Sequence, residues 1–181
     1  MSLSADILKT KIKDAIEGMH SSAGDALSML GDTLSSYIME NAQINFSWNG
    51  IQPATPPVPD PKVTTTGEIM GLSFQLTPSL ATSQAEAINH LKSELITGLT
   101  AAQYNITEAG FTTVAMSMST SPGISSLNIS ISGNDRDAAL GQLANGVVTW
   151  ITAQVPTGII LGSHGAFVAP AGTGGMVTAI T

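Results

Sequence analysis

The chain of 181 residues has no cysteine, few aromatic residues and very few charged ones. Without cysteine it can form neither a disulfide bond nor a thiolate metal site. Charged residues make up 10% of the sequence, against about 25% in an average globular protein. Its surface must therefore be covered largely by Ser, Thr, Asn, Gln and Gly, or by other protein chains.

Positive charge is scarce as well, because the net charge is −7 and three of the six basic residues are Lys9, Lys11 and Lys13. Nucleic-acid binding needs clustered cations that displace counterions from phosphates. The sequence therefore argues against a nucleic-acid partner. We interpret the three lysines as a solvated helix face.

Neither a secretory signal nor a membrane span is indicated. Residues 1–20 mix charged and apolar groups and lack an uninterrupted apolar core. No charged residue follows Asp137, but Gln142, Asn145 and Thr149 interrupt this stretch at helical spacing, whereas a span needs about 20 mainly apolar residues. We expect no membrane contact and burial of this stretch against protein.

One phrase occurs twice, as ALSMLGDTLSSYI at residues 26–38 and as ALGQLANGVVTWI at residues 139–151. Apolar spacing of three and four predicts helices at about 4–19, from 25 to near 41, from 83 to about 99, and over the second copy of the phrase. The expected N-terminal caps are Ser4, Asp25, Ser83 with Glu86, and Asn134 with Asp137.

Alternating residues predict short strands. Ile44, Phe46 and Trp48 share one side of the first, and residues 63–76 alternate through Met70, Leu72, Phe74 and Leu76. Five prolines between positions 53 and 61 exclude an inner strand there. Residues 111–132 are interpreted as a β-hairpin, and GIILG, AFVA and MVTAI, after Pro156, as three further strands.

Together these patterns predict an α+β fold built from a duplicated helix-helix-strand unit with short antiparallel strands. Residues 1–80 form the first unit with a Pro-rich arm. Residues 81–181 form the second, with the β-hairpin insertion at about 111–132 and an uncharged C-terminal arm. Each unit alone offers little apolar material, so we expect both to fold together as one body with extended Pro/Gly-rich arms.

No catalytic, cofactor or metal site is expected. Ser163 and His164 are neighbours, which point to opposite faces of an extended chain, and no nucleophile-base-acid pattern surrounds His20 or His90. The sequence GNDRD at 133–137 lacks the spacing of a calcium loop. The glycine clusters lack the residues of a phosphate-binding loop. The sequence thus predicts a protein that is not an enzyme.

A structural role explains these features best. Neighbouring chains could bury the arms and add strands to exposed sheet edges, so we expect a homo-oligomer. The candidate interface positions share apolar character or a place in a predicted arm or strand: Phe46, Trp48, Pro56, Pro57, Pro59, Met70, Phe74, Ile159, Ile160, His164, Phe167 and Met176.

The stretches ALSMLGDTLSSYIMENAQINF with DPKVTTTGEI, and ALGQLANGVVTWI with APAGTGGMVTAIT, carry a resemblance. In this layout the chain resembles small virion structural proteins of tailed bacteriophages. The resemblance implies a non-enzymatic building block of a tail, neck, baseplate or capsid surface, made in the host cytoplasm and located in the virion. Its partners would be copies of itself and other virion proteins.

Two other classes stay open. The first is a soluble ligand-binding or adhesion module that uses the loops near Trp48 and His164. The second, more remote, is an enzyme. Saturable binding of a small ligand or glycan would favour the first, and loss of function on replacing His164 would favour the second.

Overall fold

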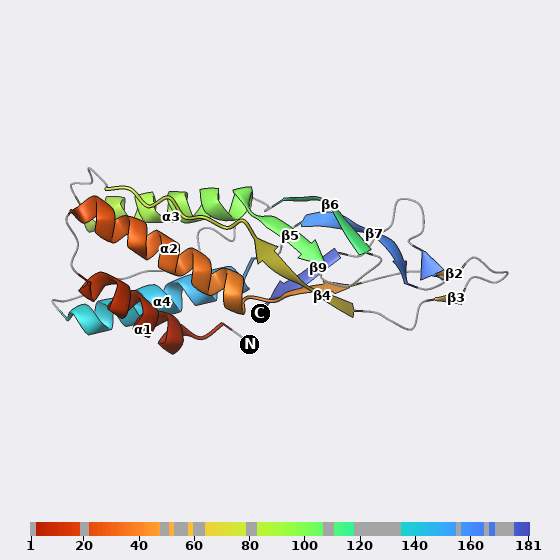
Figure 1. Cartoon of the computed structure of the whole chain (residues 1–181), viewed down its shortest axis with the longest axis horizontal. Helices are drawn as coiled ribbons and strands as arrows, with labels where there is room; N and C mark the ends of the chain where they lie inside the picture. Colours follow the sequence, from red (N-terminus) through yellow and green to blue (C-terminus); the bar gives the residue numbers. More distant parts are fainter. Residues whose placement is uncertain are drawn as a thin grey trace.

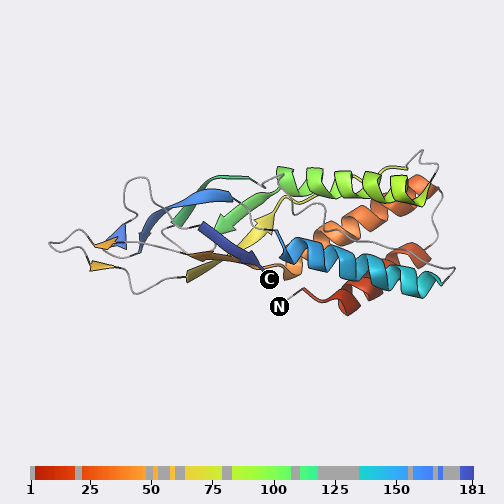
Figure 2. The same cartoon turned by 180° about the vertical axis from the view of Figure 1, so that it is seen from behind.

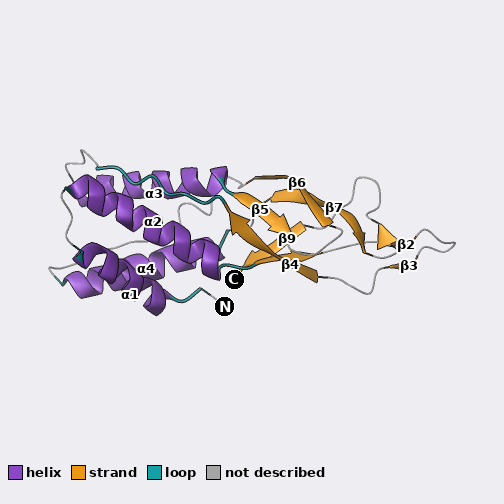
Figure 3. Ribbon diagram, viewed as in Figure 1, coloured by secondary structure: helices purple, strands orange, loops and turns teal. Residues whose placement is uncertain are grey.

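The computed structural model shows an elongated molecule with helices at one end and strands at the other (Figures 1 and 2). It describes residues 3–18, 22–47, 51–52, 58–59, 64–78, 83–106, 111–117, 135–154, 157–164, 167–168 and 176–181. Helices and antiparallel strands occupy separate parts of the chain in space (Figure 3). The predicted α+β class is confirmed.

Four helices lie in the described part of the chain: α1 (Ala5–Glu17), α2 (Ala23–Asn41), α3 (Gln84–Ala101) and α4 (Arg136–Thr152). α1 packs against both α2 and α4. The two copies of the repeated phrase begin at the fourth residue of α2 and the fourth residue of α4. Within these ranges, no helix is long and apolar enough to span a membrane.

The helix starts agree with the sequence prediction in part. Ser83 and Glu86 form the predicted reciprocal cap of α3. The cap of α2 is Ser22 instead of Asp25, because the Ser22 hydroxyl accepts a hydrogen bond from the Asp25 amide at 3.2 Å. The predicted cap lies three residues too late in the sequence. Asp25 belongs to the first turn of α2, where its negative charge favours the helix N-terminus.

The caps of α4 and α1 differ from the prediction as well. Asp135 caps α4 by accepting hydrogen bonds from two amides of the first turn, whereas the predicted Asn134 lies outside the described residues. Ser4 occupies the N-cap position of α1, but its side chain makes no capping bond. Instead the Tyr37 hydroxyl accepts from the Ser4 amide at 2.7 Å and donates to the Ser4 carbonyl at 2.8 Å.

The first sheet has four antiparallel strands, in the order β5 (Gln103–Ile106), β4 (Thr64–Met70), β1 (Ile44–Ser47) and β9 (Met176–Ile180). β1 confirms the predicted alternation, because Ile44 and Phe46 are fully buried. β5 was not predicted. It is short and follows directly after α3.

The second sheet extends from beside the first sheet to the end of the molecule that is far from the helices (Figure 1). Its order is β3 (Val58–Pro59), β2 (Ile51–Gln52), β8 (Phe167–Val168), β7 (Thr157–His164) and β6 (Phe111–Ser117). β6 also lies beside β5, and β7 lies beside β9. The outer strands of the first sheet are therefore flanked by strands of the second.

The three strands predicted after Pro156 are confirmed as β7, β8 and β9. They pair with β6, β2 and β1 of the same chain. The described part of the expected C-terminal arm is thus used within the molecule, because its strands complete the chain's own sheets. Of the predicted hairpin at 111–132, β6 is present, and the second half lies outside the described residues.

The alternation predicted through residues 63–76 changes phase at Gly71. Ile69 is buried and Met70 is exposed. After Gly71 the buried residues are Leu72, Phe74 and Leu76. Gly71 has a φ of +64°, a conformation that glycine adopts readily. Gly71 ends β4 and shifts the inward-facing positions from odd to even residue numbers. Met70 therefore faces outward, whereas Leu72 faces the core.

Residues 72–78, here called the strap, run in extended form along α2 and α3 (Figure 3). The strap packs tightly against glycines on both helices: a β-carbon at Gly31 would overlap the Phe74 carbonyl, and one at Gly98 would lie 2.7 Å from the Ser73 carbonyl. The Ser35 hydroxyl accepts from the Phe74 amide at 2.9 Å. These contacts place the Phe74 side chain between α2 and α3.

A single apolar core continues from the helices into the first sheet. It combines side chains of both halves of the sequence, and its fully buried large members are Trp150, Tyr37, Phe46, Phe74, Leu8, Ile12, Leu34, Ile38, Ile44, Ile69 and Leu95. Tyr104 donates its hydroxyl to the Leu99 carbonyl at 2.7 Å, and burial raises the pKa of this hydroxyl well above its usual range. The core therefore fixes how α3 continues into β5.

Candidate functional site

The second sheet brings three predicted interface positions to the end of the molecule far from the helices (Figure 1). Pro59 pairs with Ile51 of β2, and Ile51 pairs with Val168 of β8. Phe167, also in β8, pairs with His164 at the end of β7. Positions that are more than 100 residues apart in sequence thus meet in one narrow sheet.

The remaining strand positions lie closer to the middle of the molecule. Ile159 and Ile160 pair with β6, at Val114 and Thr113. Met176 begins β9 and pairs with Ser47 at the end of β1. Three further interface candidates, Trp48, Pro56 and Pro57, lie outside the described residues.

Phe46 and Phe74 do not lie on the surface, contrary to their choice as interface candidates. They are 0% and 2% exposed. Phe46 faces the core from β1. Phe74 belongs to the strap and is enclosed between α2 and α3. The alternating pattern correctly marked them as apolar positions but did not tell a core face from an interface.

Met70 is a predicted interface residue with an exposed side chain, and Pro59 is exposed as well. Met70 lies on β4 and is 42% exposed. The side-chain amide of Asn105, on the neighbouring strand β5, donates to the Met70 sulfur at 2.9 Å. Glu68 and Gln103 are also exposed on these two strands. The outer face of β4 and β5 therefore presents one methionine among polar side chains.

A cluster that the sequence did not reveal joins the strap to α3. The Thr77 hydroxyl and the Thr77 amide both donate to Oε1 of Glu94, at 2.6 and 3.0 Å. Nε2 of His90 lies 3.2 Å from the Thr77 hydroxyl and 3.2 Å from the same Glu94 oxygen. The Glu94 side chain is 15% exposed and that of His90 is 37% exposed.

This cluster differs from a hydrolytic triad in one decisive respect. In a triad the histidine uses one nitrogen for the nucleophile and the other for the orienting carboxylate. Here Nε2 of His90 approaches both partners, and the Thr77 hydroxyl already donates to Glu94. The arrangement fastens Thr77 to α3, and it does not activate the hydroxyl through a histidine.

Two pockets flank the cluster, and both are lined by His90 and Glu94. One has a volume of about 360 Å³ and polar neighbours that include Gln75 and Thr97. The other has a volume of about 340 Å³ and an apolar wall that includes Leu91. The carboxylate of Glu94 and the imidazole of His90 thus lie between two pockets.

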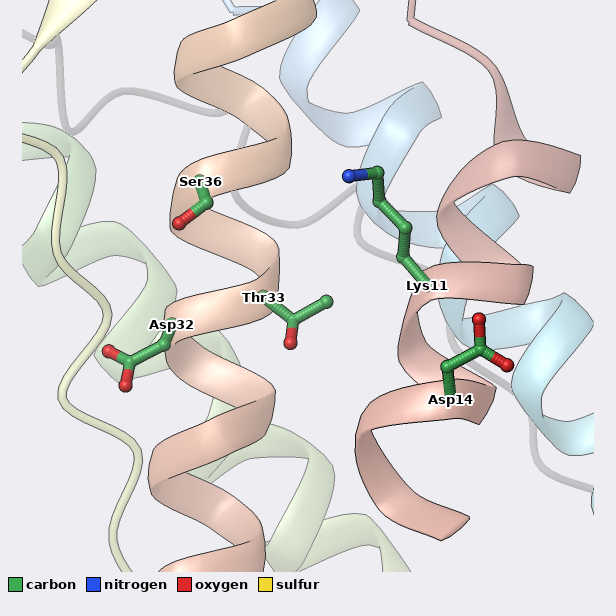
Figure 4. A pocket seen from close by; sticks show the side chains of 5 residues that line it. All are labelled: Lys11, Asp14, Asp32, Thr33 and Ser36. Atoms are coloured by element: carbon green, nitrogen blue, oxygen red, sulfur yellow. The ribbon is translucent and has the colours of Figure 1, made fainter. Parts of the chain in front are cut away.

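A third pocket, of about 340 Å³, lies between α1 and α2 (Figure 4). It is lined by Lys11, Asp14, Asp32, Thr33 and Ser36. Figure 4 shows the carboxylates of Asp14 and Asp32 pointing away from each other. In the parts of the chain that the structure describes, no group of three or more His, Cys, Asp or Glu side chains could hold a metal ion.

The lysines of α1 are paired within the molecule. Lys9 Nζ lies 2.6 Å and Lys13 Nζ lies 3.8 Å from the Asp137 carboxylate in the first turn of α4. Lys11 lies 3.6 Å from Glu40 of α2. The hydrogen bond from Lys9, aided by the charges of both lysines, lowers the pKa of Asp137. These lysines join α1 to its neighbouring helices at the surface.

Comparison with known proteins found no relative, because no family model, no curated protein and no solved structure matches the chain. The surface and contacts of the chain itself are the basis for a functional proposal.

Proposed function

We propose that this protein is a non-enzymatic structural subunit that assembles with copies of itself and with other proteins, as in the particle of a tailed bacteriophage. The observation that supports this most is the large surface of the single chain. It exposes 9567 Å², whereas a compact monomer of 18.5 kDa would expose about 8,200 Å².

The excess is large enough to matter for assembly. It amounts to roughly 1,400 Å², and a typical specific interface removes about 800 Å² from each partner. The elongated shape in Figures 1 and 2 is consistent with a surface larger than that of a compact monomer. A subunit with neighbours on two sides would bury it.

The nature of the surface supports the same role. Ile7, Met29 and Met70 are 52%, 46% and 42% exposed, and only 10% of all residues carry a charge. Few charges must be removed from water when such a surface meets another protein, so the desolvation cost of association is low. The bacteriophage context rests on the resemblance of the sequence stretches quoted above.

The duplicated unit belongs to this proposal. An Ala-Gln pair follows α2 and α3 and leads into a strand, at Ala42-Gln43 and Ala102-Gln103. A further Ala-Gln pair follows α4 at Ala153-Gln154. The junctions after α2 and α4, together with the repeated phrase in these two helices, support the proposed duplication of a helix-helix-strand unit.

The surfaces that we assign to assembly differ from the arms expected at first. β7, β8 and β9 complete the chain's own sheets, so they are not free for exchange with a neighbour. We assign contact instead to the outer face of β4 with Met70 and to the second sheet with Pro59 and Phe167.

A decisive experiment is sedimentation velocity of the untagged protein over a wide concentration range, alone and with proteins encoded beside it. Concentration-dependent association, or a complex with one of those proteins, is the expected result. A strict monomer at about 1 mM that binds none of them would contradict the proposal, because a weak interface would still associate at that concentration.

A ligand-binding or adhesion module is the second candidate. The observation that favours it is the sheet register: β2 begins three residues after Trp48 and is linked through β8 to the strand that ends at His164. The start of β2 and His164 therefore belong to the same end of the molecule. Saturable binding of a glycan that is lost in Trp48→Ala and kept in Trp150→Phe would support this function.

A further inference from the structure

A pocket at the helical end of the molecule is bounded by three separate segments. Its volume is about 340 Å³, and α2, the strap and α3 all contribute to its walls. Most of its lining is apolar: Leu27, Leu30, Leu76, Ala87 and Leu91. Pockets of about 300–1,000 Å³ with mainly apolar walls and a few polar groups are typical of small-molecule sites. The size and the lining of this pocket therefore fit a small organic ligand.

The apolar walls leave surface that a ligand can cover. Leu30 and Leu76 are buried in the core, whereas Leu27 and Leu91 are only half-buried. An alkyl chain that lies against Leu27 and Leu91 would remove apolar surface of both partners from water, which favours binding. The pocket thus favours a ligand with an aliphatic part.

One charged group of this pocket lacks a permanent counter-charge. The Glu94 side chain is 15% exposed, and in the part of the chain that the structure describes no lysine or arginine pairs with it. Its ion-pair partner there is His90, and a histidine is charged only when it is protonated. Buried carboxylates are normally paired, because removing an unpaired charge from water is costly. A cation supplied by a ligand would complete the pair.

The two oxygens of Glu94 differ in what they already contact. Oε1 accepts two hydrogen bonds from Thr77 and lies 3.2 Å from Nε2 of His90, so its bonding capacity is used. Oε2 accepts no hydrogen bond from the residues that the structure describes. Thr77 thus holds the carboxylate in place through one oxygen and leaves the other for a ligand.

We propose that this pocket binds a small primary alkylammonium ion, with the charged nitrogen at Oε2 of Glu94 and the alkyl chain against Leu27 and Leu91. An ammonium group carries hydrogen-bond donors and no acceptor, and its charge-assisted bond to a carboxylate is about twice as strong as a bond between neutral groups. The net charge of −7 attracts a cation and repels an anion. The site lies on α2, the strap and α3, so it is separate from the surfaces that we assign to assembly.

The test is calorimetric titration of the untagged protein with n-hexylammonium chloride at pH 7.5. An alkylamine is protonated at this pH, as a lysine side chain is. We expect saturable binding of one ion per chain. 1-Hexanol has the same chain without the charge, and hexanoate has the opposite charge. Each should bind at least tenfold more weakly than hexylammonium.

Two substitutions of exposed alanines on α3 locate the site. Ala87 lines the proposed pocket, and Ala101 lines the other pocket that Glu94 borders. Ala87→Phe should fill the proposed pocket and reduce the affinity for hexylammonium at least tenfold. Ala101→Phe is the matched control and should bind like the wild-type protein. Glu94→Gln keeps the shape of the side chain and removes its charge, so the preference for hexylammonium over hexanol should disappear.

A measurement on the wild-type protein guards against variants that fail to fold. Hexylammonium should shift the methyl signals of Leu27 and Leu91 in a nuclear magnetic resonance spectrum and leave those of the exposed Ile7 and Met70 unchanged. Absence of saturable binding up to about 10 mM, equal affinity for hexylammonium and hexanol, or loss of binding in Ala101→Phe but not in Ala87→Phe would each overturn the proposal.

Discussion

Gly31 of α2 lies directly against the backbone carbonyl of Phe74, so that no side chain fits between the helix and the strap. One turn later the Ser35 hydroxyl donates to the Gly31 carbonyl at 2.8 Å and accepts from the Phe74 amide. Gly98 meets the strap in the same close way from α3. The strap thus fills the place that direct packing of side chains between α2 and α3 would otherwise take.

Replacing Gly31 by Ala should destabilise the protein. The added methyl group must displace the strap, and overpacking of this kind costs about 1–3 kcal/mol. Gly141→Ala in α4 is the matched control, because its β-carbon would meet nothing closer than 3.7 Å, and a helical alanine should then add about 0.5–1 kcal/mol. Urea unfolding followed by circular dichroism measures both. Equal effects of the two substitutions would contradict the close packing at Gly31.

The Tyr37 hydroxyl should contribute more to the start of α1 than the Ser4 side chain does. Tyr37→Phe leaves the amide and carbonyl of Ser4 without this partner, so we expect a loss of about 1–2 kcal/mol. Ser4→Ala should cost far less than a normal cap replacement of about 1 kcal/mol, since the Ser4 side chain makes no capping bond. Urea unfolding of both variants decides this, and the reverse order would refute it.

The ion pair between α1 and α4 should make stability depend on acidity. The pKa of Asp137 is lowered in the folded protein, so its contribution is present above its unfolded pKa of about 3.9 and is lost as the pH falls through the folded value. Asp137→Asn should therefore reduce stability at pH 7 and have a smaller effect near pH 3.

Asp32→Asn is the control for this pH dependence. Asp32 is exposed and forms no ion pair with the residues that the structure describes. Thermal unfolding of both variants at several pH values gives the comparison. An effect of Asp137→Asn that stays constant from pH 7 to pH 3 would rule out the ion pair as its cause.

Self-association should respond to Met70 more strongly than to Met29. Both methionines are exposed to a similar degree, at 42% and 46%, but only Met70 lies on the β4 face that we assign to assembly. Met70→Lys should weaken association in sedimentation velocity by at least tenfold and leave the unfolding midpoint nearly unchanged. Met29→Lys should leave association as it is. If Met29→Lys has the larger effect, the contact surface lies on the helices.

Local sequence patterns were sufficient for most helices and several strands. The apolar spacing in α2 and α4 and the reciprocal cap at Ser83 are local signals, and each predicted an element that the structure contains. β5 was missed although it is no shorter than β1, which was predicted. The sequence contained a usable signal. Residues 102–105 read AQYN, and residues 42–45, which lead into β1, read AQIN.

The remaining differences come from contacts between distant segments. The outward direction of Met70 depends on the left-handed conformation of Gly71, which an apolar pattern does not show. The burial of Phe74 requires two glycines on separate helices. The spacing of His90 and Glu94 was visible in the sequence, but the hydroxyl of Thr77 reaches them only because the strap returns along α3.

Pro59 lies in β3, the outermost strand of the second sheet, and β2 is its partner in that sheet. A proline has no amide hydrogen, so this border offers an approaching strand one donor fewer than a normal border would. Pairing of a second strand with this border is therefore less favourable than with a border that has all its amide donors. Growth of one continuous sheet from molecule to molecule, the route to fibrous precipitates, is hindered at this end while discrete contacts remain available.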